Sequence, residues 1–491
     1  MDEFYMFLIA AVAIHCCLIF FDIFFKSCSL HPYLYFLKNT GLQIQPLRLT
    51  WFTLAFNRQI QKWGTIRPRL HLAWFTAGVW VSVFLMPVAL ILIIHTMIIT
   101  IKDSFQEEKT VSRIVAVEPM VPGWNLPTSD FGYYLFTLLI SSVIHELGHA
   151  VAAVREGVHV IGVSITLFFI LPVAMTHLEG LDVLSPMKQL RVLCAGVWHN
   201  IFLALVAATL APLVPWILYP FYDFGTGVQV EFIKEGSAIS GVGGLKVGDK
   251  IVQLNHCTVS GTSSWQECLV QSLYDSNNGF CIPDSFIKEH DESVPAKHLT
   301  DGAVECCAGN SAKHLCFEYI ESEDEPLPLP QHSCLNARNV IDIAGVMCHK
   351  ASDCPQPLHC FRPSLENSTK LIRIQRSRSS KVLFLGHPAD IYHNVKVTDF
   401  VNLYSFLPPY IPDALTKLCQ FITIFSSGIA VLNVIPCFYF DGQNIICTLV
   451  DVFLAKKVPL ASVRHAVALC ITLLGSFILI LYLCIMLFSA V

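Results

Sequence analysis

Residues 131–154 read FGYYLFTLLISSVIHELGHAVAAV, an apolar run long enough to cross a lipid bilayer as one helix. The second half of this run carries the pattern HELGH. On a helix, residues four apart share a face, so His145 and His149 can present two imidazoles to one metal ion, with Glu146 beside them. Ionisable residues inside a span are costly unless a partner such as a metal ion compensates them. The stretch therefore predicts a metal centre within a membrane helix, with Glu146 as general base.

The whole chain has the composition of a multi-pass membrane protein. Of its 491 residues, 54% are hydrophobic and 14% are charged, whereas ordinary soluble domains have about 25% charged residues. The mean hydropathy is +0.56. These values argue against a soluble, disordered or fibrous chain. The formal charge of −5 leaves no basic excess for a nucleic acid, so no nucleic-acid partner is expected.

Six stretches predict membrane helices by their length and hydrophobicity. The fifth is interrupted by Pro212 and Pro215, and the sixth is longer than one crossing needs. A shorter apolar piece, 161–175, is rich in β-branched and aromatic residues, which favours a re-entrant element over a further span. The six stretches are 4–25, 73–101, 131–154, 190–219, 414–454 and 463–491.

The distribution of basic residues predicts the orientation of these helices. The loop 26–72 carries seven Lys and Arg residues and no Asp or Glu. Such an excess is typical of cytosolic loops. Counting spans onward from this loop puts 102–130 in the lumen and 155–189 in the cytosol. The polar region between the fifth and sixth spans is then lumenal.

The cysteines support that orientation independently. Ten of the nineteen lie within 257–360, in the predicted lumenal region, and an even cluster of this kind favours disulfides. Asn367 begins an Asn-Ser-Thr sequon, and its glycosylation requires the same compartment. A reduced, metal-binding cytosolic domain is the alternative, although the cluster has no paired C-x-x-C motifs.

The lumenal region divides into two parts. Its first stretch, 227–251, alternates apolar residues at strand spacing and resembles a PDZ domain, which binds extended peptides at a sheet edge. A small β-rich spacer is the alternative. The expected organisation is two N-terminal helices (1–101), a lumenal loop (102–130), core helices with the re-entrant element (131–220), a PDZ-like domain (221–280), a Cys-rich lumenal region (281–410) and C-terminal core helices (411–491).

A hydrolytic zinc site needs a third protein ligand and an open position for water. Asp441 is the best candidate, because it lies within an apolar stretch where an unpaired carboxylate would be prohibitive. Pro436 and Gly442 interrupt the helix around it, which frees backbone groups that could meet an extended substrate. A carboxylate in a solvated loop is the alternative.

Together these features resemble the site-2 protease family of intramembrane zinc metalloproteases. The resemblance rests on HELGH in one span, the pattern N-x-x-P-x-x-x-x-D-G in a later span and the PDZ-like insert between them. It implies one Zn²⁺ ion held by His145, His149 and Asp441, with Glu146 as the catalytic base. Phe440 stands where the family usually has Leu, an apolar exchange. Supporting stretches are 56–58, 121–127, 193–200 and 305–307.

The same resemblance extends to residues around the metal. Asn433 and Pro436 match the family motif near the active site, where the asparagine is thought to hold unwound substrate. Within 193–200, His199 and Asn200 could stabilise an oxyanion or orient a ligand. The packing of polar residues between helices is the alternative for both.

The function implied by the resemblance is peptide-bond hydrolysis within the bilayer, toward its cytosolic side. Substrates would be the membrane helices of transcription factor precursors of the sterol-response and ER-stress type, anchored in the endoplasmic reticulum or Golgi. A first lumenal cut would precede release of the cytosolic domain. A metal or proton transporter and a non-catalytic membrane scaffold are the alternatives. The oligomeric state is left open.

Overall fold

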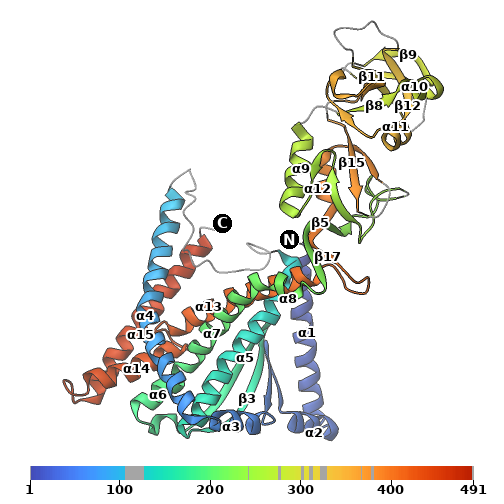
Figure 1. Cartoon of the computed structure of the whole chain (residues 1–491). Helices are drawn as coiled ribbons and strands as arrows, with labels where there is room; N and C mark the ends of the chain where they lie inside the picture. Colours follow the sequence, from blue (N-terminus) through green and yellow to red (C-terminus); the bar gives the residue numbers. More distant parts are fainter. Residues whose placement is uncertain are drawn as a thin grey trace. The chain divides into compact units, whose positions relative to one another are not determined.

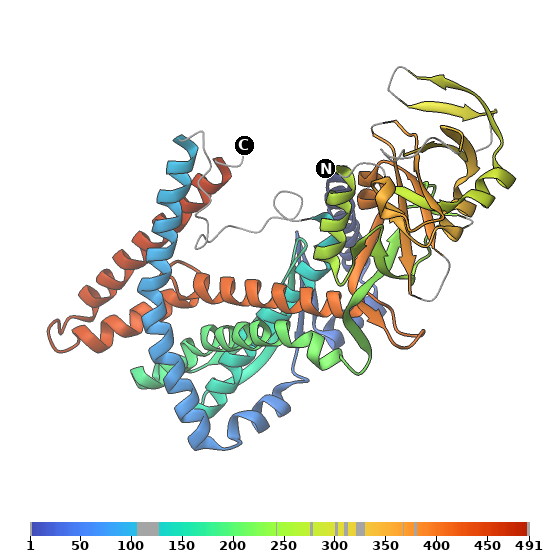
Figure 2. The ribbon, with the colours of Figure 1, turned by 45° about the horizontal axis from the view of Figure 1, so that its top comes forward.

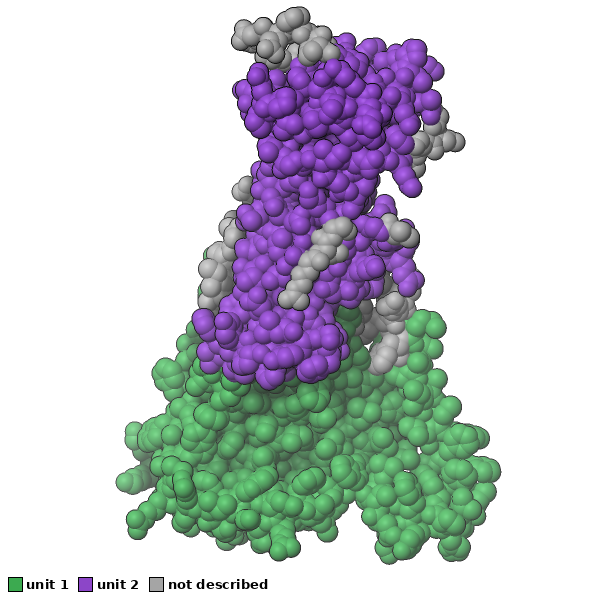
Figure 3. Space-filling view, turned by 45° about the vertical axis from the view of Figure 1, so that its right-hand side comes forward, with its two compact units in different colours: residues 1–212, 416–491 green, residues 213–415 purple. Residues whose placement is uncertain are grey.

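The computed structural model describes residues 2–105, 127–241, 243–274, 278–299, 303–308, 313–320, 329–366, 368–377 and 381–488. They form two compact units, coloured separately in Figure 3. The first unit comprises 1–212 and 416–491, and the second comprises 213–415. The predicted glycosylation site Asn367 lies outside the described residues.

Among the described residues, six helical segments are long and apolar enough to cross a membrane, which confirms the prediction of about six spans. Helices α4 and α15 lie side by side in both ribbon views (Figures 1 and 2). The helices that lie wholly or mostly in the first unit are α1 (Asp2–Ser27), α2 (His31–Thr40), α3 (Asn57–Thr65), α4 (Pro68–Phe105), α5 (Phe131–Glu156), α6 (Pro186–Leu193), α7 (Ala195–Leu210), α13 (Ile411–Val434), α14 (Asp441–Leu454) and α15 (Ala461–Phe488).

The long sixth stretch is two helices rather than one. Helix α13 ends at Val434 and α14 begins at Asp441. Pro436 lies in the connection and has no backbone N–H to continue the helical ladder. Tyr439, with φ at +70°, turns the chain. The break therefore leaves Asp441 at the start of a new helix.

The segment 161–175, expected as a re-entrant element, forms most of a β-hairpin. Strands β3 (His159–Phe168) and β4 (Leu171–Glu179) pair with each other, and β3 also pairs with β2 (Arg48–Thr53). With β1 (Leu42–Gln45) they make an antiparallel four-stranded sheet. Successive residues of β3 alternate between outer and buried positions, as its β-branched residues favour. The segment is thus extended chain rather than a further helix, and β4 packs beside α5 (Figure 1).

The second unit contains a sheet whose strands come from two separated stretches of sequence. Its order is β16-β15-β6-β5-β17, with β7 paired to β6. The expected PDZ-like domain covers 221–280. In the structure, residues 370–402 also contribute strands to this sheet, so the folded unit does not end at residue 280. The elements are α8 (Val214–Leu218), β5 (Tyr222–Ile233), β6 (Lys250–Leu254), β7 (Cys257–Thr258), α9 (Thr262–Tyr274), β15 (Lys370–Arg376), β16 (Val382–Gly386), α12 (Pro388–Asn394) and β17 (Val395–Asn402).

A second, disulfide-linked sheet lies between these two stretches in the chain. Its order is β12-β11-β14-β8-β13, and the hairpin of β9 and β10 accompanies it. Phe280, Phe317 and Phe361 fill its core. The elements are β8 (Gly279–Pro283), α10 (Asp284–His290), β9 (Ser293–His298), β10 (Val304–Cys307), β11 (His314–Tyr319), β12 (His332–Asn336), α11 (Ala337–Ile343), β13 (Met347–Cys348) and β14 (Leu358–Pro363).

All ten cysteines of the predicted cluster are paired, which confirms that the region is disulfide-bonded. The other nine cysteines of the chain are free thiols. The five bonds are Cys257–Cys268, Cys281–Cys354, Cys306–Cys316, Cys307–Cys334 and Cys348–Cys360.

Loop length predicts which disulfide matters most for stability. Cys281–Cys354 closes 73 residues, whereas Cys257–Cys268 closes 11. The chain-entropy model gives about 4 kcal/mol for the longer loop and about 3 kcal/mol for the shorter one. Replacing both cysteines of the longer pair by Ala should lower the thermal midpoint of the purified protein more than the same change in the shorter pair. Cys470→Ala, which removes a cysteine that forms no disulfide, is the control. Equal thermal midpoints for the two double-alanine variants would contradict the prediction.

Candidate active site

Helix α5 places the two histidines of HELGH on one buried face. Their Nε2 atoms lie 3.2 Å apart, and the exposed fraction is 5% for His145 and 7% for His149. Ala150 and Ala153 on the same helix are fully buried, so neighbouring elements approach its backbone closely. The helical repeat brings residues four apart together, and this is the basis on which the pair was predicted.

The carboxylate of Asp441 meets this pair from the first turn of α14. Its Oδ2 lies 2.9 Å from Nε2 of His145 and 3.2 Å from Nε2 of His149. The approach depends on Gly442, because a Cβ there would collide with the backbone carbonyl of Ile435. The structure thus brings together the three proposed metal ligands, although 296 residues separate the first from the last.

Each imidazole is oriented through its other ring nitrogen. Nδ1 of His149 donates to the backbone carbonyl of Val192 on α6, at 2.8 Å. Nδ1 of His145 lies 3.2 Å from the amide of Asn200 on α7, which is fully buried. Such contacts fix the ring and its tautomer in metal sites. Sequence reasoning missed Val192, because a backbone carbonyl has no side-chain signature.

The arrangement fits a zinc ion. Two imidazole nitrogens and a carboxylate oxygen are a known ligand set of hydrolytic zinc sites. Space at these atoms is kept by Gly196 on α7, where a Cβ would lie 2.6 Å from Nε2 of His145 and would collide with His149. Oδ1 of Asn200 is buried and has no hydrogen-bond partner among the described residues. If the amide group is rotated by 180°, this oxygen accepts a hydrogen bond from the N–H at Nδ1 of His145, the tautomer present when Nε2 binds metal.

One carboxylate oxygen of Glu146 is held by strand β4. Oε2 accepts a hydrogen bond of 2.7 Å from the backbone N–H of Thr176, whose hydroxyl donates to the backbone carbonyl of Glu146. One turn earlier, the Ser142 hydroxyl accepts from the N–H of Ala174 at 2.8 Å. Among the described residues Oε1 has no hydrogen-bond partner, so it is available to a water molecule. Sequence reasoning missed these strand contacts, and the alternating pattern in 161–175 is the signal that could have predicted them.

His199 lies on α7, where its ring bonds to its own helix. Its Nδ1 donates to the carbonyl of Ala195 on the same helix, at 2.8 Å. The ring packs beside Trp74 and Phe75 of α4. Within the described residues no hydrogen bond joins it to the proposed ligands. The contacts are those that helix packing requires.

Asn433 and Pro436 flank the end of α13. Asn433 is half-buried in the last turn of the helix, and its side chain has no hydrogen-bond partner in the described part of the chain. Pro436 is buried, and a Cβ at Gly475 of α15 would collide with its carbonyl oxygen. The amide of Asn433 is therefore free, whereas Pro436 is fixed against α15.

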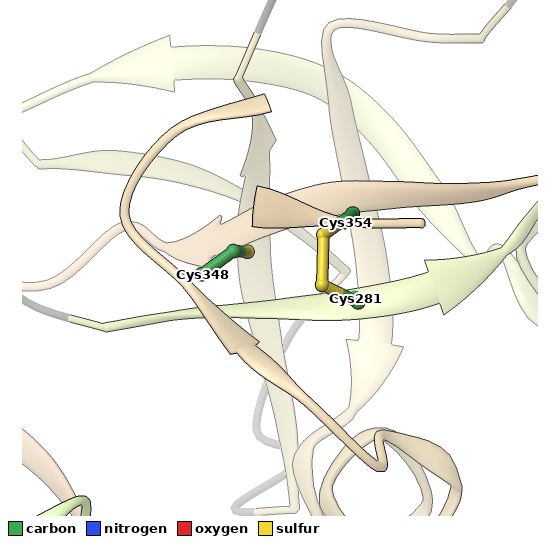
Figure 4. A group of neighbouring side chains, drawn as sticks. All are labelled: Cys281, Cys348 and Cys354. Carbon is green, nitrogen blue, oxygen red and sulfur yellow. A yellow bond between two sulfur atoms is a disulfide. The ribbon is translucent and has the colours of Figure 1, made fainter. Parts of the chain in front are cut away.

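A second group of potential metal ligands lies in the disulfide-linked sheet, but it is not a metal site. The sulfur atoms of Cys281, Cys348 and Cys354 lie within 4.8 Å of one another. Figure 4 shows that Cys281 and Cys354 are bonded, and Cys348 pairs with Cys360. Disulfide sulfurs offer no thiolate to a metal. The other such group among the described residues is His145, Glu146 and His149.

Comparisons with known proteins agree with this geometry. The family model described as peptidase family M50 matches residues 133–475, a span that contains all three proposed ligands and Glu146. The membrane-bound transcription factor site-2 protease homolog of Arabidopsis thaliana is 24% identical over 447 residues, which cover 80% of this chain and 83% of that protein. The chain therefore belongs to peptidase family M50, the site-2 protease family of zinc-dependent membrane metalloproteases.

The close approach at Gly196 predicts a specific loss of metal. Gly196→Ala should lower zinc content by at least about tenfold, because the added methyl group occupies the space around both Nε2 atoms. Gly132→Ala in α5 is the matched control, since nothing lies within 4 Å of its Cβ. Elemental analysis of both purified variants is the measurement. Equal zinc content would show that the site tolerates the methyl group.

The contact between Asn200 and His145 predicts a smaller effect. Asn200→Ala should weaken zinc affinity by about 10- to 100-fold, because the ring of His145 loses its fixed orientation. Thr209→Ala on the same helix is the control, since that hydroxyl bonds only to the backbone of its own helix. Competition with a chelator measures the affinity of each. If the two variants retain zinc equally, Asn200 acts only in helix packing.

Proposed function

We propose that this protein is an intramembrane endopeptidase that uses one zinc ion to cleave the membrane-spanning segments of its substrates. The observation that carries the proposal is the convergence of His145, His149 and Asp441 within 3.2 Å of one another, next to Glu146. All four lie in or beside apolar helices of the first unit. Membership in a metalloprotease family supports the reaction.

In this mechanism His145, His149 and Asp441 hold the zinc ion, which supplies Lewis acidity when bound. Glu146 is the general base. The N–H of Thr176 fixes Oε2, so the carboxylate is oriented before the reaction and Oε1 remains free to take a proton from water. The same carboxyl group then passes that proton to the leaving amine. His149 and His145 keep their orientation through Val192 and Asn200.

The substrate must unwind before cleavage, because a membrane helix satisfies its own backbone hydrogen bonds and hides its carbonyls. Asn433 offers a free amide at the end of α13, next to the break at 435–440. We assign it to binding the unwound substrate backbone, with Pro436 keeping the break in place. Helix-breaking residues in a substrate therefore favour cleavage.

The substrate class follows the name of the Arabidopsis relative, a membrane-bound transcription factor site-2 protease homolog. We propose that this chain cleaves membrane-anchored transcription factor precursors of the sterol-response and ER-stress type. A first lumenal cut by another protease precedes the reaction, and the cytosolic domain is released. The endoplasmic reticulum and Golgi are the corresponding compartments.

The β-rich second unit is assigned to the lumen. Five disulfides support an oxidising compartment, and glycosylation of Asn367 belongs to the same proposal. We interpret the sheet of β5, β6 and β15–β17 as PDZ-like, either capturing peptide or excluding substrates with intact ectodomains. The apolar part of this hairpin, 161–175, is proposed to re-enter the bilayer beside α5, because the backbone of β4 bonds to Ser142 and Glu146 within that span.

The role of Glu146 predicts the result of one substitution. Glu146→Gln should reduce cleavage at least about 100-fold, because the amide cannot accept the proton of water. Zinc content should be unchanged, since the metal ligands are intact. The assay follows release of the cytosolic fragment from a lumenally trimmed, membrane-anchored transcription factor in cells that lack endogenous activity, with Glu179→Gln as an expression-matched control.

The other functions predict different outcomes. Equal release by wild type and Glu146→Gln would remove the proteolytic function. Metal flux across vesicles that persists in Glu146→Gln would favour a transporter. A scaffold predicts that His145→Ala leaves function intact. Loss of zinc from Glu146→Gln would instead show that Glu146 is a ligand rather than the base.

A further inference from the structure

A basic cavity lies at the C-terminal end of α5, in the first unit. Its volume is about 680 Å³, and its walls are α3 and the junction between α5 and β3. This volume is within the range of small-molecule sites. The proposed proteolytic reaction does not use this cavity, because its lining residues do not include the ligand triad or Glu146.

The wall formed by α3 is fixed. The side-chain amide of Asn57 donates to the backbone carbonyl of Ile161 in β3, at 2.9 Å. Ile60 is 2% exposed, and a Cβ at Gly64 would lie only 2.6 Å from the Val154 side chain of α5. Helix α3 is therefore anchored to α5 and β3 along its length, and the cavity is part of the folded unit.

The lining of this cavity is cationic. Arg58, Lys62 and His159 contribute to it, and none of the lining residues is acidic. Neither Arg58 nor Lys62 has an ion-pair or hydrogen-bond partner among the described residues. Both side chains are exposed, as is Gln61 between them. Two accessible cations of the cavity therefore have no anionic partner in the described part of the chain.

The surroundings indicate a membrane ligand. Thr65, which lines the cavity, precedes the candidate span Pro68–Lys102 by three residues. The candidate span Phe131–Glu156 ends at the wall of the same cavity. Trp63 and Ile66, next to the cavity in sequence, are about half exposed, at 46% and 45%. Aromatic residues of this kind gather at membrane interfaces. Basic pockets at the cytosolic ends of spans bind phosphorylated lipid head groups.

We propose that this cavity binds the head group of a phosphoinositide, a phosphorylated polyol carried by a membrane lipid. A phosphomonoester, with a charge near −2, matches the two unpaired cations. Arg58 and Lys62 bind the phosphate, and the side-chain amide of Gln61, an exposed residue of the lining, bonds to an inositol hydroxyl. Because α3 packs on the catalytic helix α5, the bound lipid stabilises the end of that helix.

The test uses the purified full-length chain in phosphatidylcholine nanodiscs, titrated with a fluorescent short-chain phosphatidylinositol 4-phosphate and followed by anisotropy. Saturable binding is expected. Arg58→Gln/Lys62→Gln should weaken it by about 30-fold, from the contribution of each basic residue near a membrane. Gln61→Trp, which fills the cavity without changing charge, should weaken it as well. Unchanged thermal midpoints would show that the variants are folded.

The matched control is Lys38→Gln/Arg69→Gln, which removes two exposed charges of the same loop outside the cavity. It should bind as wild type does. An equal loss in both double variants would overturn the proposal, because the loop would then attract anionic lipid without a site. If soluble inositol phosphate binds as tightly as the lipid, the claim that the ligand is a membrane lipid is wrong. If inorganic phosphate alone binds with the same affinity as the lipid, the claim that the cavity recognises the inositol ring is wrong.

Discussion

The placement of a carboxylate and two imidazoles inside an apolar helix bundle is the constraint on which the rest of the structure depends. An isolated charge in such a medium is strongly unfavourable, so these groups must contact one another and a fixed set of hydrogen-bond partners. The required distances leave little tolerance, since Oδ2 of Asp441 lies within 3.2 Å of both rings. The surrounding backbone must therefore approach very closely.

Glycines provide that approach at each junction. Gly196 brings α7 against the histidine pair, and Gly442 brings the start of α14 against the end of α13. Gly475 lets α15 meet the carbonyl of Pro436, which fixes the break that precedes Asp441. A methyl group at Gly442 or Gly475 would collide with neighbouring backbone, and one at Gly196 would collide with the two imidazoles. The site is thus formed by how closely these helices pack, as much as by its polar side chains.

Local periodicity explains which parts of this site the sequence predicts. His145 and His149 follow from the helical repeat alone, and Asp441 follows from the cost of a carboxylate in an apolar stretch. The number of disulfide-bonded cysteines was also predictable, but their pairing was not, because connectivity depends on which strands lie side by side. The hairpin of β3 and β4 was missed for a similar reason. The alternation within 161–175 is consistent with a strand, but its pairing partner β2 lies more than a hundred residues earlier, so the sequence does not show which strand it joins.

The missed hairpin changes how the proposed base is understood. From the sequence, Glu146 is positioned only by its helix, where a long side chain retains several rotamers. The bond from Thr176 to Oε2 restricts that freedom, and the Thr176 hydroxyl ties the strand to the helix backbone at the same residue. Ser142 repeats the attachment one turn earlier. Any movement of β4 along α5 therefore shifts the carboxylate relative to the ligand triad, which makes the hairpin part of the geometry that sets the base.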